Sequence, residues 1–276
     1  MPVEKLQQLR DLLGTFPSCL VADSGGVDSV FLARVAQDVL GPRSLAVIAD
    51  SPSLPRRELE EALEIGRAFG IPVRVIRTAE FDNASYLANP VNRCYFCKHE
   101  LFSELEILAR QEKYAAILYG ENASDVGDFR PGAQAAKEFQ VRAPLKEVGL
   151  TKAEIRELSA QLGLPTADKP QMACLSSRIP HGEVVSPAKL AMIEAAENVL
   201  RDLGFHDLRV RHHELPLADG QKKPLALARV EVGAGELARL FEEKTREHVA
   251  QRLREIGYAH VTLDLQGYRR GSLNPV

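Results

Sequence analysis

One hexapeptide, Ser24-Gly25-Gly26-Val27-Asp28-Ser29, carries most of the information about fold and chemistry in this chain. It follows the apolar run Cys19–Ala22 and precedes the helix-like run Val30–Val35, so the sequence predicts a strand, a glycine turn and a helix start. The glycines let backbone N–H groups approach an anion, the helix N-terminus adds positive potential, and Ser24 and Ser29 add hydroxyl donors. The hexapeptide has no lysine, which excludes a Walker-type phosphate loop. An ordinary glycine-rich turn is the less favoured alternative.

Apolar runs and helical patterns alternate through the first half of the chain. The expected elements are strands at 45–49, 73–76 and 115–119 and helices at 58–69 and 98–110. This alternation predicts an α/β fold in which helices cover a parallel, Rossmann-like sheet. Ligands of such sheets bind beyond the carboxyl ends of the strands. The Ser24 loop, Asp50-Ser51 and Gly120-Glu121-Asn122 should therefore converge at one edge.

A second region begins where prolines cluster, between Pro165 and Pro187. Its expected elements are a helix at 187–203, strands at 208–211 and 225–232, a helix at 236–256 and a strand at 260–265. We expect a phosphate-binding domain at 1–165 and, at 166–276, a smaller α/β domain that serves substrate binding or oligomerisation. Shortly before this boundary, Thr151 and Glu154 have the spacing of a capping box at a helix start.

The charge balance argues against an extended nucleic-acid interface. The 276 residues include 35 Lys and Arg against 38 Asp and Glu, which gives a net charge of −3, whereas nucleic-acid binders usually carry a basic excess. Hydrophobic residues make up 45% of the chain, enough for a sizeable core. No window approaches the roughly 18 uninterrupted apolar residues of a membrane span, and no signal core is visible. A soluble, cytoplasmic protein is expected.

Three of the four cysteines form a pattern with chemical meaning. Cys94 and Cys97 are separated by two residues and stand just before the expected helix at 98–110, where a helix N-terminus favours the thiolate. With Cys174 they could hold a zinc ion or a [4Fe–4S] cluster that has one open iron. A surface thiol pair or half of a zinc site is the alternative for the first two. Cys19, inside the first strand, is expected to be a buried hydrophobe.

The hexapeptide resembles the PP-loop of the ATP pyrophosphatases, which cut ATP between its α- and β-phosphates. The whole chain resembles the LarE family of ATP-dependent sulfur transferases, which serve nickel-pincer nucleotide biosynthesis. The segments that carry this resemblance are Ser24–Ser29, Asn89–Lys98, Gly120–Asp125, Asp128–Gly132, Ala173–Pro180 and Gly267–Asn274. The segment around Cys174 makes the resemblance specific to the family.

The resemblance implies a small nucleotide substrate, pyridinium-3,5-biscarboxylic acid mononucleotide. ATP adenylates one of its carboxylates with release of pyrophosphate, and sulfur then displaces AMP to give a thiocarboxylate. One branch of the family uses a single cysteine, matching Cys174, as a sacrificial sulfur donor. Another branch has three cysteines that are thought to hold a [4Fe–4S] cluster that relays sulfide. Cys94 and Cys97 favour the second branch, with sulfide or another sulfur donor as a partner, and the family also suggests a homo-oligomer.

Two carboxylates are candidates for a Mg²⁺ ion that accompanies ATP, because Mg²⁺ prefers few carboxylates together with phosphate oxygens and water. They are Asp28 in the hexapeptide and Asp125. As alternatives, Asp28 could serve only as a helix N-terminal carboxylate and Asp125 could cap a turn. The expected ATP-binding residues are Ser24, Gly25, Gly26, Asp28, Ser29, Asp50, Ser51, Asn122 and Asp125.

Arginines of the second region are candidates for the substrate phosphate. Arg209 and Arg211 alternate with apolar residues, so both point to one face of a strand, where paired guanidinium groups could grip a phosphate. The alternative is a solvated sheet face, and the neighbouring His212-His213-Glu214 is expected to lie at the surface. Arg130 and Arg178 lie inside the family-like segments and could contact phosphates or form structural ion pairs.

Three other functions stand as alternatives. A PP-loop enzyme that thiolates tRNA would share the three cysteines and a cluster, but the net charge and the lack of a basic, aromatic-rich tail disfavour it. A non-catalytic ATP-binding or iron–sulfur carrier protein is disfavoured by the intact Ser24, Asp28 and Ser29. An amidating PP-loop enzyme would need an ammonia source, and the sequence contains no glutaminase domain.

Overall fold

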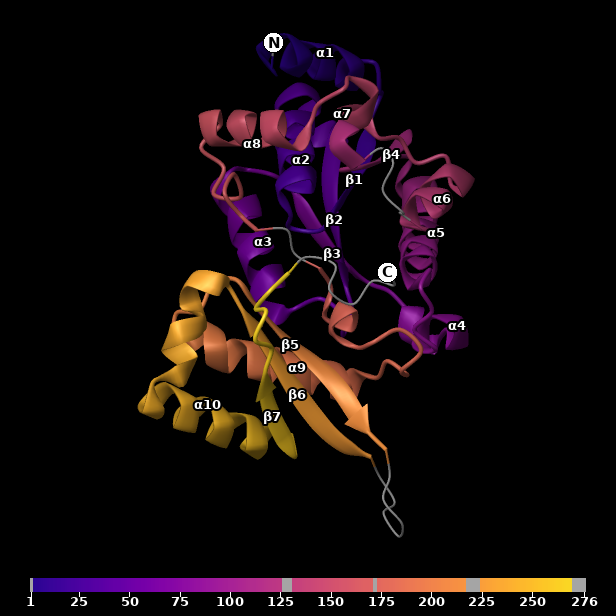
Figure 1. The fold of residues 1–276 in the computed structure, drawn as a ribbon. Coiled ribbons are helices and arrows are strands. Elements are labelled where there is room, and N and C mark those ends of the chain that lie inside the picture. Colours follow the sequence, from indigo (N-terminus) through magenta and orange to yellow (C-terminus); the bar gives the residue numbers. More distant parts are fainter. Residues whose placement is uncertain (1, 126–130, 171–172, 217–223, 270–276) are drawn as a thin grey trace. The chain divides into compact units, whose positions relative to one another are not determined.

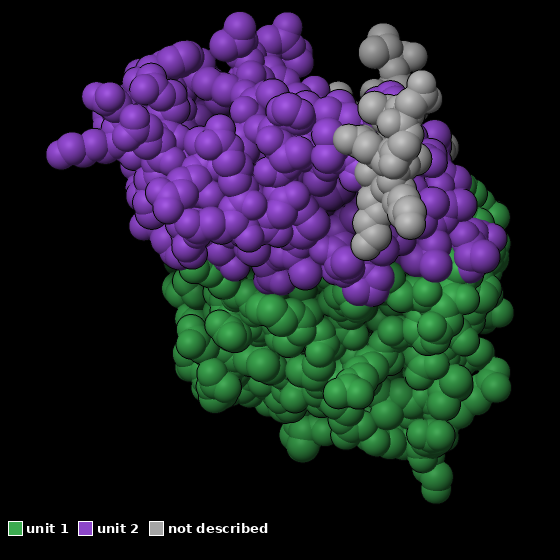
Figure 2. Space-filling model, turned by 90° about the horizontal axis from the view of Figure 1, so that it is seen from below, with its two compact units in different colours: residues 1–83, 92–172 green, residues 84–91, 173–276 purple. Residues whose placement is uncertain are grey.

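The computed structural model of the chain describes residues 2–125, 131–170, 173–216 and 224–269. It divides into two compact units. Unit 1 comprises Met1–Asn83 and Asn92–Met172, and unit 2 comprises Ala84–Val91 and Ala173–Val276 (Figure 2). Each unit has its own sheet and its own apolar core. Within the described residues, no helix is long and apolar enough to cross a bilayer.

A four-stranded parallel sheet lies at the centre of unit 1 (Figure 1). Its strands are β1 (Cys19–Asp23), β2 (Ser44–Asp50), β3 (Val73–Arg77) and β4 (Ala116–Tyr119), in the spatial order β3-β2-β1-β4. Every residue of β1 is buried, as expected for a largely apolar strand that is covered on both faces. The parallel α/β fold expected from the sequence is therefore confirmed.

Helices cover both faces of this sheet. The helices of unit 1 are α1 (Pro2–Gly14), α2 (Val27–Leu40), α3 (Arg56–Ala68), α5 (Arg93–Glu112), α6 (Pro131–Glu138), α7 (Pro144–Glu147) and α8 (Lys152–Gln161), with short 3-10 turns η1 (Gly41–Arg43), η2 (Glu80–Asp82) and η3 (Ala123–Asp125). Cys19 and Val21 of β1 pack with α1, α2 and α8, whereas Leu20 and Ala22 pack with α5 and α6. Alternate residues of one strand thus point into two separate cores.

Helix α8 begins as the sequence predicts. Thr151 is its N-cap, and the hydroxyl of Thr151 accepts a hydrogen bond from the backbone N–H of Glu154. The side chain of Glu154 accepts in return from the backbone N–H of Thr151. This reciprocal capping box satisfies two of the donors that a helix start leaves without an intrahelical partner.

Helix α5 begins earlier than the sequence predicts. It starts at Arg93 rather than at Lys98, with Asn92 in the N-cap position, because no glycine or proline interrupts the chain after that cap. Cys94 and Cys97 therefore lie inside the first two turns of the helix and not before it. Residues three positions apart are neighbours on a helix surface, so the two cysteines share one face of α5.

A three-stranded sheet forms the centre of unit 2. The strands β5 (Leu208–Leu215) and β6 (Leu225–Val232) are antiparallel, and β7 (His260–Leu263) runs parallel to β6. The helices of the unit are α4 (Ala84–Leu87), α9 (Pro187–Asp202) and α10 (Glu243–Ile256), with 3-10 helices η4 (Leu175–Arg178) and η5 (Ala234–Phe241). Leu208, Val210 and Ala228 point into the core that residues of α9 and α10 complete. The second, smaller α/β part of the expected fold is thus present.

The helix expected at 236–256 is divided in the structure. Glu242 takes an extended conformation, with φ −64° and ψ 130°, between η5 and α10. No glycine or proline marks this break, and Leu240 just before it is buried in the core of unit 2. The apolar pattern continues across the break, which is why periodicity alone predicted one helix. In the neighbouring strands, β5 continues to Leu215 and β7 ends at Leu263.

Residues 84–91 belong to unit 2 because their backbone bonds to it. The backbone N–H of Gly182 donates to the carbonyl of Asn89 at 2.9 Å, and that of Val185 donates to the carbonyl of Leu87 at 2.9 Å. Residues 166–172 stay with unit 1, where Arg156 donates to the backbone carbonyls of this segment. The change of unit therefore falls after residue 172. The assignment of the expected domains, 1–165 and 166–276, to nucleotide and substrate binding remains a prediction.

Candidate active site

The loop after β1 is tightly turned and leads directly into α2. Gly25 has a φ of +69°, a left-handed conformation that glycine adopts without a steric penalty. Gly26 is the N-cap of α2 and brings no side chain to cap the helix. The hydroxyl of Ser29, in the first turn, accepts from the backbone N–H of Ser24 at 3.1 Å. The result is a short loop whose backbone donors and helix start suit an anion.

A buried carboxylate lies at the base of this loop. Asp23, the last residue of β1, is 8% exposed. Its Oδ1 atom accepts from the backbone N–H of Gly25 and from the hydroxyl of Ser29, both at 2.8 Å. Burial raises the pKa of the Asp23 carboxyl above its ordinary value, although these hydrogen bonds oppose the shift. Asp23 was not among the predicted site residues, because one acidic residue at the end of a strand carries no specific signal.

The loops after β1 and β4 meet at one edge of the sheet. A Cβ atom on Gly120 would lie 2.8 Å from the backbone nitrogen of Ser29, so only glycine fits there. The chain proceeds from β1 to β2 and β3 on one side and returns to β4 on the other side of β1. Open α/β sheets bind ligands where the strand order reverses in this way. The expected convergence of the Ser24 loop with residues 120–122 is confirmed.

A lysine from α8 contacts the hexapeptide. The Nζ atom of Lys152 lies 2.7 Å from Oδ2 of Asp28, and its backbone N–H donates to the hydroxyl of Ser124 at 3.0 Å. Lys152 is therefore bonded to both converging loops. The second carboxylate oxygen of Asp28, Oδ1, is buried and has no hydrogen-bond partner among the described residues. No sequence signal links Lys152 to the loop, and the sequence analysis missed it.

Asn122 and Asp125 shape the turn after β4. Asn122 is 1% exposed, and its side-chain oxygen accepts from the backbone N–H of Ser124 at 2.9 Å. The carboxylate of Asp125 accepts from the backbone N–H of Asn122 at 3.1 Å. Both contacts are local turn-forming bonds of the kind that Asx residues make. They agree with the turn-capping alternative for Asp125.

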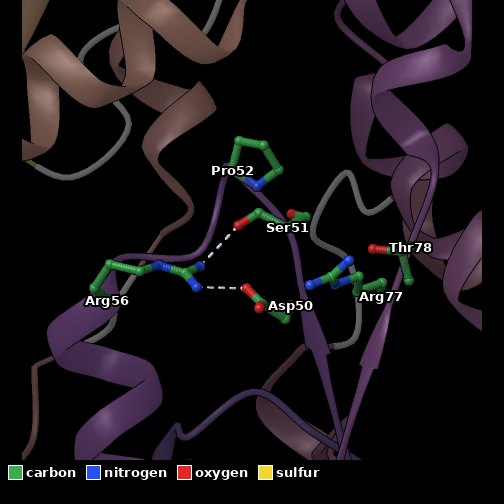
Figure 3. A pocket seen from close by; sticks show the side chains of 6 residues that line it. All are labelled: Asp50, Ser51, Pro52, Arg56, Arg77 and Thr78. Carbon is green, nitrogen blue, oxygen red and sulfur yellow. Dashed lines mark hydrogen bonds and ion pairs between the residues drawn. The ribbon is translucent and has the colours of Figure 1, made fainter.

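A cavity of about 340 Å³ opens at the carboxyl ends of β2 and β3. The residues that line it are Asp50, Ser51, Pro52, Arg56, Arg77 and Thr78 (Figure 3). Arg56 donates to the carboxylate of Asp50 at 2.6 Å and to the backbone carbonyl of Ser51 at 2.9 Å. The volume is at the lower end of the range for small-molecule pockets. Asp50 and Ser51 thus lie where the sequence predicted ligand contacts, at the edge that carries the Ser24 loop.

The four cysteines fall into three classes by exposure. Cys94 is exposed, Cys97 and Cys174 are partly buried, and Cys19 is fully buried. Burial raises the pKa of the Cys19 thiol to about 12, which confirms its expected role as an inert core residue. Cys94 and Cys97 belong to unit 1 and Cys174 to unit 2. Taken unit by unit, the described residues include no group of three His, Cys, Asp or Glu side chains arranged to hold a metal ion.

The guanidinium groups of Arg209 and Arg211 are buried, each residue being 5% exposed. Arg211 donates to Oε2 of Glu231 at 2.9 and 3.0 Å and to the carbonyl of Ser177 at 3.0 Å. Arg209 stacks on Tyr268, with 4.8 Å between the guanidinium carbon and the ring centre. The solvated sheet face considered as an alternative is therefore wrong, because other parts of unit 2 cover these arginines.

Arg178 forms a buried ion pair and supports the backbone of Cys174. It is 0% exposed and donates to both carboxylate oxygens of Glu197, at 2.8 and 3.0 Å. Another of its nitrogens donates to the carbonyls of Ala173 and Cys174. These contacts agree with the structural ion pair that the sequence analysis left open for Arg178. Arg130 and residues 270–274 of the C-terminal family-like segment lie outside the described residues.

The expectation of a surface position is wrong for His212. This residue is 2% exposed, and its Nδ1 atom lies 3.3 Å from the hydroxyl of Tyr258. Alternation along β5 places His212 on the same face as Val210, which is the face covered by helices. Burial lowers the pKa of His212 to about 4.

Comparison with known proteins finds relatives that cover most of the chain. No family model matches the chain. An uncharacterized protein of Synechocystis is 42% identical over 272 residues, 99% of this chain and 97% of that protein. The pyridinium-3,5-bisthiocarboxylic acid mononucleotide synthase of Lactiplantibacillus plantarum is 32% identical over 255 residues, 92% of this chain and 88% of that protein. The tRNA-specific 2-thiouridylase MnmA of Xanthobacter autotrophicus is 28% identical over 260 residues, 76% of this chain and 63% of that protein.

Proposed function

The chain belongs to the LarE family of ATP-dependent sulfur transferases, and from this premise we propose that it converts a carboxylate of pyridinium-3,5-biscarboxylic acid mononucleotide to a thiocarboxylate. The carboxylate oxygen attacks the α-phosphorus of ATP, and pyrophosphate leaves. A sulfur nucleophile then attacks the carbonyl carbon of the acyl adenylate, and AMP leaves with the C–O bond electrons. Adenylation is needed because an unactivated carboxylate would have to expel oxide, a far poorer leaving group than AMP.

The observation that carries this proposal is the Ser24–Ser29 loop with its charged neighbours. We assign the β- and γ-phosphates of ATP to the backbone N–H groups at the start of α2, because those of Ser24 and Gly25 already donate to the Ser29 hydroxyl and the Asp23 carboxylate. Preorganised donors of this kind stabilise the charge that develops on the leaving pyrophosphate. The ammonium group of Lys152 lies 2.7 Å from the carboxylate of Asp28. It therefore supplies the positive charge that the hexapeptide lacks, next to the site proposed for the phosphates.

Asp28 fits a Mg²⁺ ion by one specific feature. Its Oδ1 atom is buried without a hydrogen-bond partner among the described residues, and a buried carboxylate oxygen without a partner is costly unless a ligand satisfies it. When bound, Mg²⁺ would neutralise phosphate charge. Asp28 and the phosphate oxygens would hold it, and Lys152 would balance the charge of Asp28 before the ion binds.

We assign the cavity beside Asp50 and Ser51 to the nucleoside part of ATP. It lies at the same edge of the sheet as the loop, and its polar lining offers both donors and acceptors. The ion pair between Arg56 and Asp50 fixes one wall of the cavity. Asn122 and Asp125 fix the shape of the turn after β4, and we propose that they contribute to the ATP site from that turn.

The sulfur is proposed to pass through Cys94, Cys97 and Cys174. Support comes from exposure, because these three thiols reach solvent to some extent while Cys19 does not. It also comes from the shared helix face of Cys94 and Cys97. A [4Fe–4S] cluster held by the three thiolates would supply one open iron that binds sulfide. The alternative is that Cys174 gives up its own sulfur and ends as dehydroalanine.

Arg209 and Arg211 are the proposed ligands of the substrate phosphate. Both point to the sheet face of unit 2 that lies opposite its helices, and Glu231 fixes the orientation of Arg211. The contacts of Arg178 favour a supporting role: it holds the segment that carries Cys174. From the family resemblance we also expect a cytoplasmic homo-oligomer.

The direct test is an anaerobic assay with ATP, the mononucleotide and sulfide. We expect AMP, pyrophosphate and a product in which sulfur replaces oxygen, and a tRNA substrate should give no thiolated base. Thiolation of tRNA instead would favour the second candidate function, which the similarity to the 2-thiouridylase supports. Iron and acid-labile sulfide near four per chain, lost in Cys174→Ala, would support the cluster. A single turnover in which the protein loses the mass of one H₂S would support sacrificial transfer.

A further inference from the structure

The peptide groups on either side of Gly25 are held by charged side chains of opposite sign. The backbone N–H of Gly25 donates to Oδ1 of Asp23 at 2.8 Å, and its carbonyl accepts from Nζ of Lys169 at 3.1 Å. Asp23 is the last residue of β1, whereas Lys169 is 144 positions away from Gly25 in the chain. All of these residues belong to unit 1. Neither charged group enters the reaction proposed above.

Lys169 is itself fixed in place. Its side chain is 9% exposed and pairs with Glu58 at 2.6 Å and Glu61 at 2.8 Å, both on α3. Burial opposes the charge on Lys169, but the two glutamates outweigh this effect and raise its pKa above the ordinary value. Its backbone carbonyl accepts from Arg156 at 2.7 Å. The ammonium group is therefore charged and held on a fixed stretch of backbone.

Gly25 needs such support because its conformation is easily changed. Glycine populates positive and negative φ about equally, so a peptide next to it can rotate at little cost. Rotation of the peptide after Gly25 would turn its carbonyl oxygen toward an anion bound at the loop. The bond to Lys169 keeps this oxygen directed at a cation, and the bond to Asp23 fixes the preceding peptide.

We propose that Lys169 is a positioning residue for the triphosphate of ATP, which acts through the carbonyl of Gly25 together with Asp23 on the other side. This inference rests on the proposed use of the loop for ATP. Lys169 also balances the negative charge of three carboxylates, those of Asp23, Glu58 and Glu61. Without the lysine, their negative charge would oppose a polyphosphate more than a monophosphate.

The test compares the binding of α,β-methylene-ATP and of AMP, with each dissociation constant measured by titration calorimetry. Lys169→Met should raise the dissociation constant of α,β-methylene-ATP by about tenfold or more, which corresponds to the loss of one hydrogen bond to a charged group. The same substitution should change the dissociation constant of AMP much less, so the ratio of the triphosphate constant to the AMP constant should rise. Lys169→Arg, which retains the charge, should bring the ratio back toward the wild-type value.

Lys189→Gln is the matched control. Lys189 also donates to a backbone carbonyl, that of Val184 at 2.7 Å, and pairs with Glu214 at 3.0 Å, but it belongs to unit 2. Loss of these contacts should lower stability without changing the ratio of the two dissociation constants. A purely structural role for Lys169 predicts the same behaviour for Lys169→Met, and that result would overturn the proposal.

A second variant guards against a failure to fold. Lys169→Met combined with Glu58→Gln and Glu61→Gln removes the two carboxylate charges that the single change would leave without their cation. It still lacks the bond to the Gly25 carbonyl, so the shifted ratio should persist, and a wild-type ratio in this variant would contradict the proposal. Absence of triphosphate binding by the wild-type protein would instead overturn the proposed function, and this inference with it.

Discussion

The ammonium nitrogen of Lys152 lies 2.7 Å from Oδ2 of Asp28, although the two residues are 124 positions apart in the chain. This pair brings a cation to the hexapeptide Ser24–Ser29, which has none of its own. The fold makes the pair possible, because α8 starts beside the turn after β4 and that turn packs against the start of α2.

Lys152→Met should lower the rate of ATP-dependent pyrophosphate release by about 100-fold, the usual effect of removing one charge-stabilising donor from a reacting centre. The variant should keep its fold, because the side chain of Lys152 is 30% exposed. Lys5→Gln is the control: it breaks an ion pair with Glu154 on the same helix, α8, without touching the loop. An unchanged rate in Lys152→Met would exclude Lys152 from the phosphate site.

The ion pair between Arg178 and Glu197 makes a prediction about stability. Arg178→Met leaves the carboxylate of Glu197 buried with fewer partners, so the free energy of unfolding should fall by about 3–5 kcal/mol. Urea denaturation followed by circular dichroism measures this loss. Arg252→Met removes an exposed pair with Glu255 and should cost less than about 1 kcal/mol. Equal losses in the two variants would mean that burial adds nothing to the importance of Arg178.

The capping box of α8 makes a smaller prediction. Thr151→Ala removes the hydroxyl that caps the backbone N–H of Glu154 and should lower the free energy of unfolding by about 1 kcal/mol. Thr151→Ser retains the capping oxygen and should be close to the wild type in the same denaturation experiment. A loss of equal size in both variants would show that the methyl group of Thr151, and not its hydroxyl, matters.

Local sequence signals predicted the local structure. The wholly buried β1, the glycine turn after it and the capping box at Thr151 and Glu154 each depend on residues within one short segment. The parallel sheet followed from the alternation of such segments. The start of α5 was predicted too late, because the segment Cys94–Cys97 was placed just before the helix although it contains no helix breaker.

Contacts between distant segments could not be predicted in the same way. The pairing of Lys152 with Asp28 and of Lys169 with Gly25 depends on how separate elements pack, and neither pair leaves a pattern in the sequence. The alternation in β5 showed that Arg211 and His212 point to opposite faces. It could not show that both faces are covered, because the covering residues come from elsewhere in unit 2.

His212 predicts a pH dependence of stability. Its pKa is about 4 in the folded protein, against about 6.5 in an unfolded chain. Between these values the unfolded state binds more protons, so the free energy of unfolding falls as the pH decreases from 7. Between pH 7 and pH 5, the protonation of His212 in the unfolded state should lower the free energy of unfolding by about 2 kcal/mol. Urea denaturation of His212→Gln at pH 7 and at pH 5 should show a smaller decrease in the free energy of unfolding than the wild type does. An equal decrease in the two proteins would contradict the prediction.

The contribution of Asp23 to the free energy of unfolding should change with pH in the opposite direction. Burial raises the pKa of its carboxyl above the unfolded value, so the folded state binds this proton more tightly than the unfolded state does. The resulting stabilisation is fully present below the unfolded pKa and is lost as the pH rises through the folded pKa. At pH 7 the raised pKa of Asp23 therefore costs stability, and the hydrogen bonds that its carboxyl accepts from Gly25 and Ser29 oppose this cost.

Asp23→Asn separates these two effects, because the amide oxygen can still accept from Gly25 and Ser29 while the charge is gone. At pH 7 the variant should be more stable than the wild type, and this advantage should shrink as the pH is lowered toward 4. Asp38→Asn, which removes the charge of a partly exposed carboxylate paired with Arg34, should show no such gain. If Asp23→Asn is less stable at pH 7, the attraction between Asp23 and Lys169 outweighs the cost of burying the carboxylate, and the ionised form of Asp23 is the one that the loop requires.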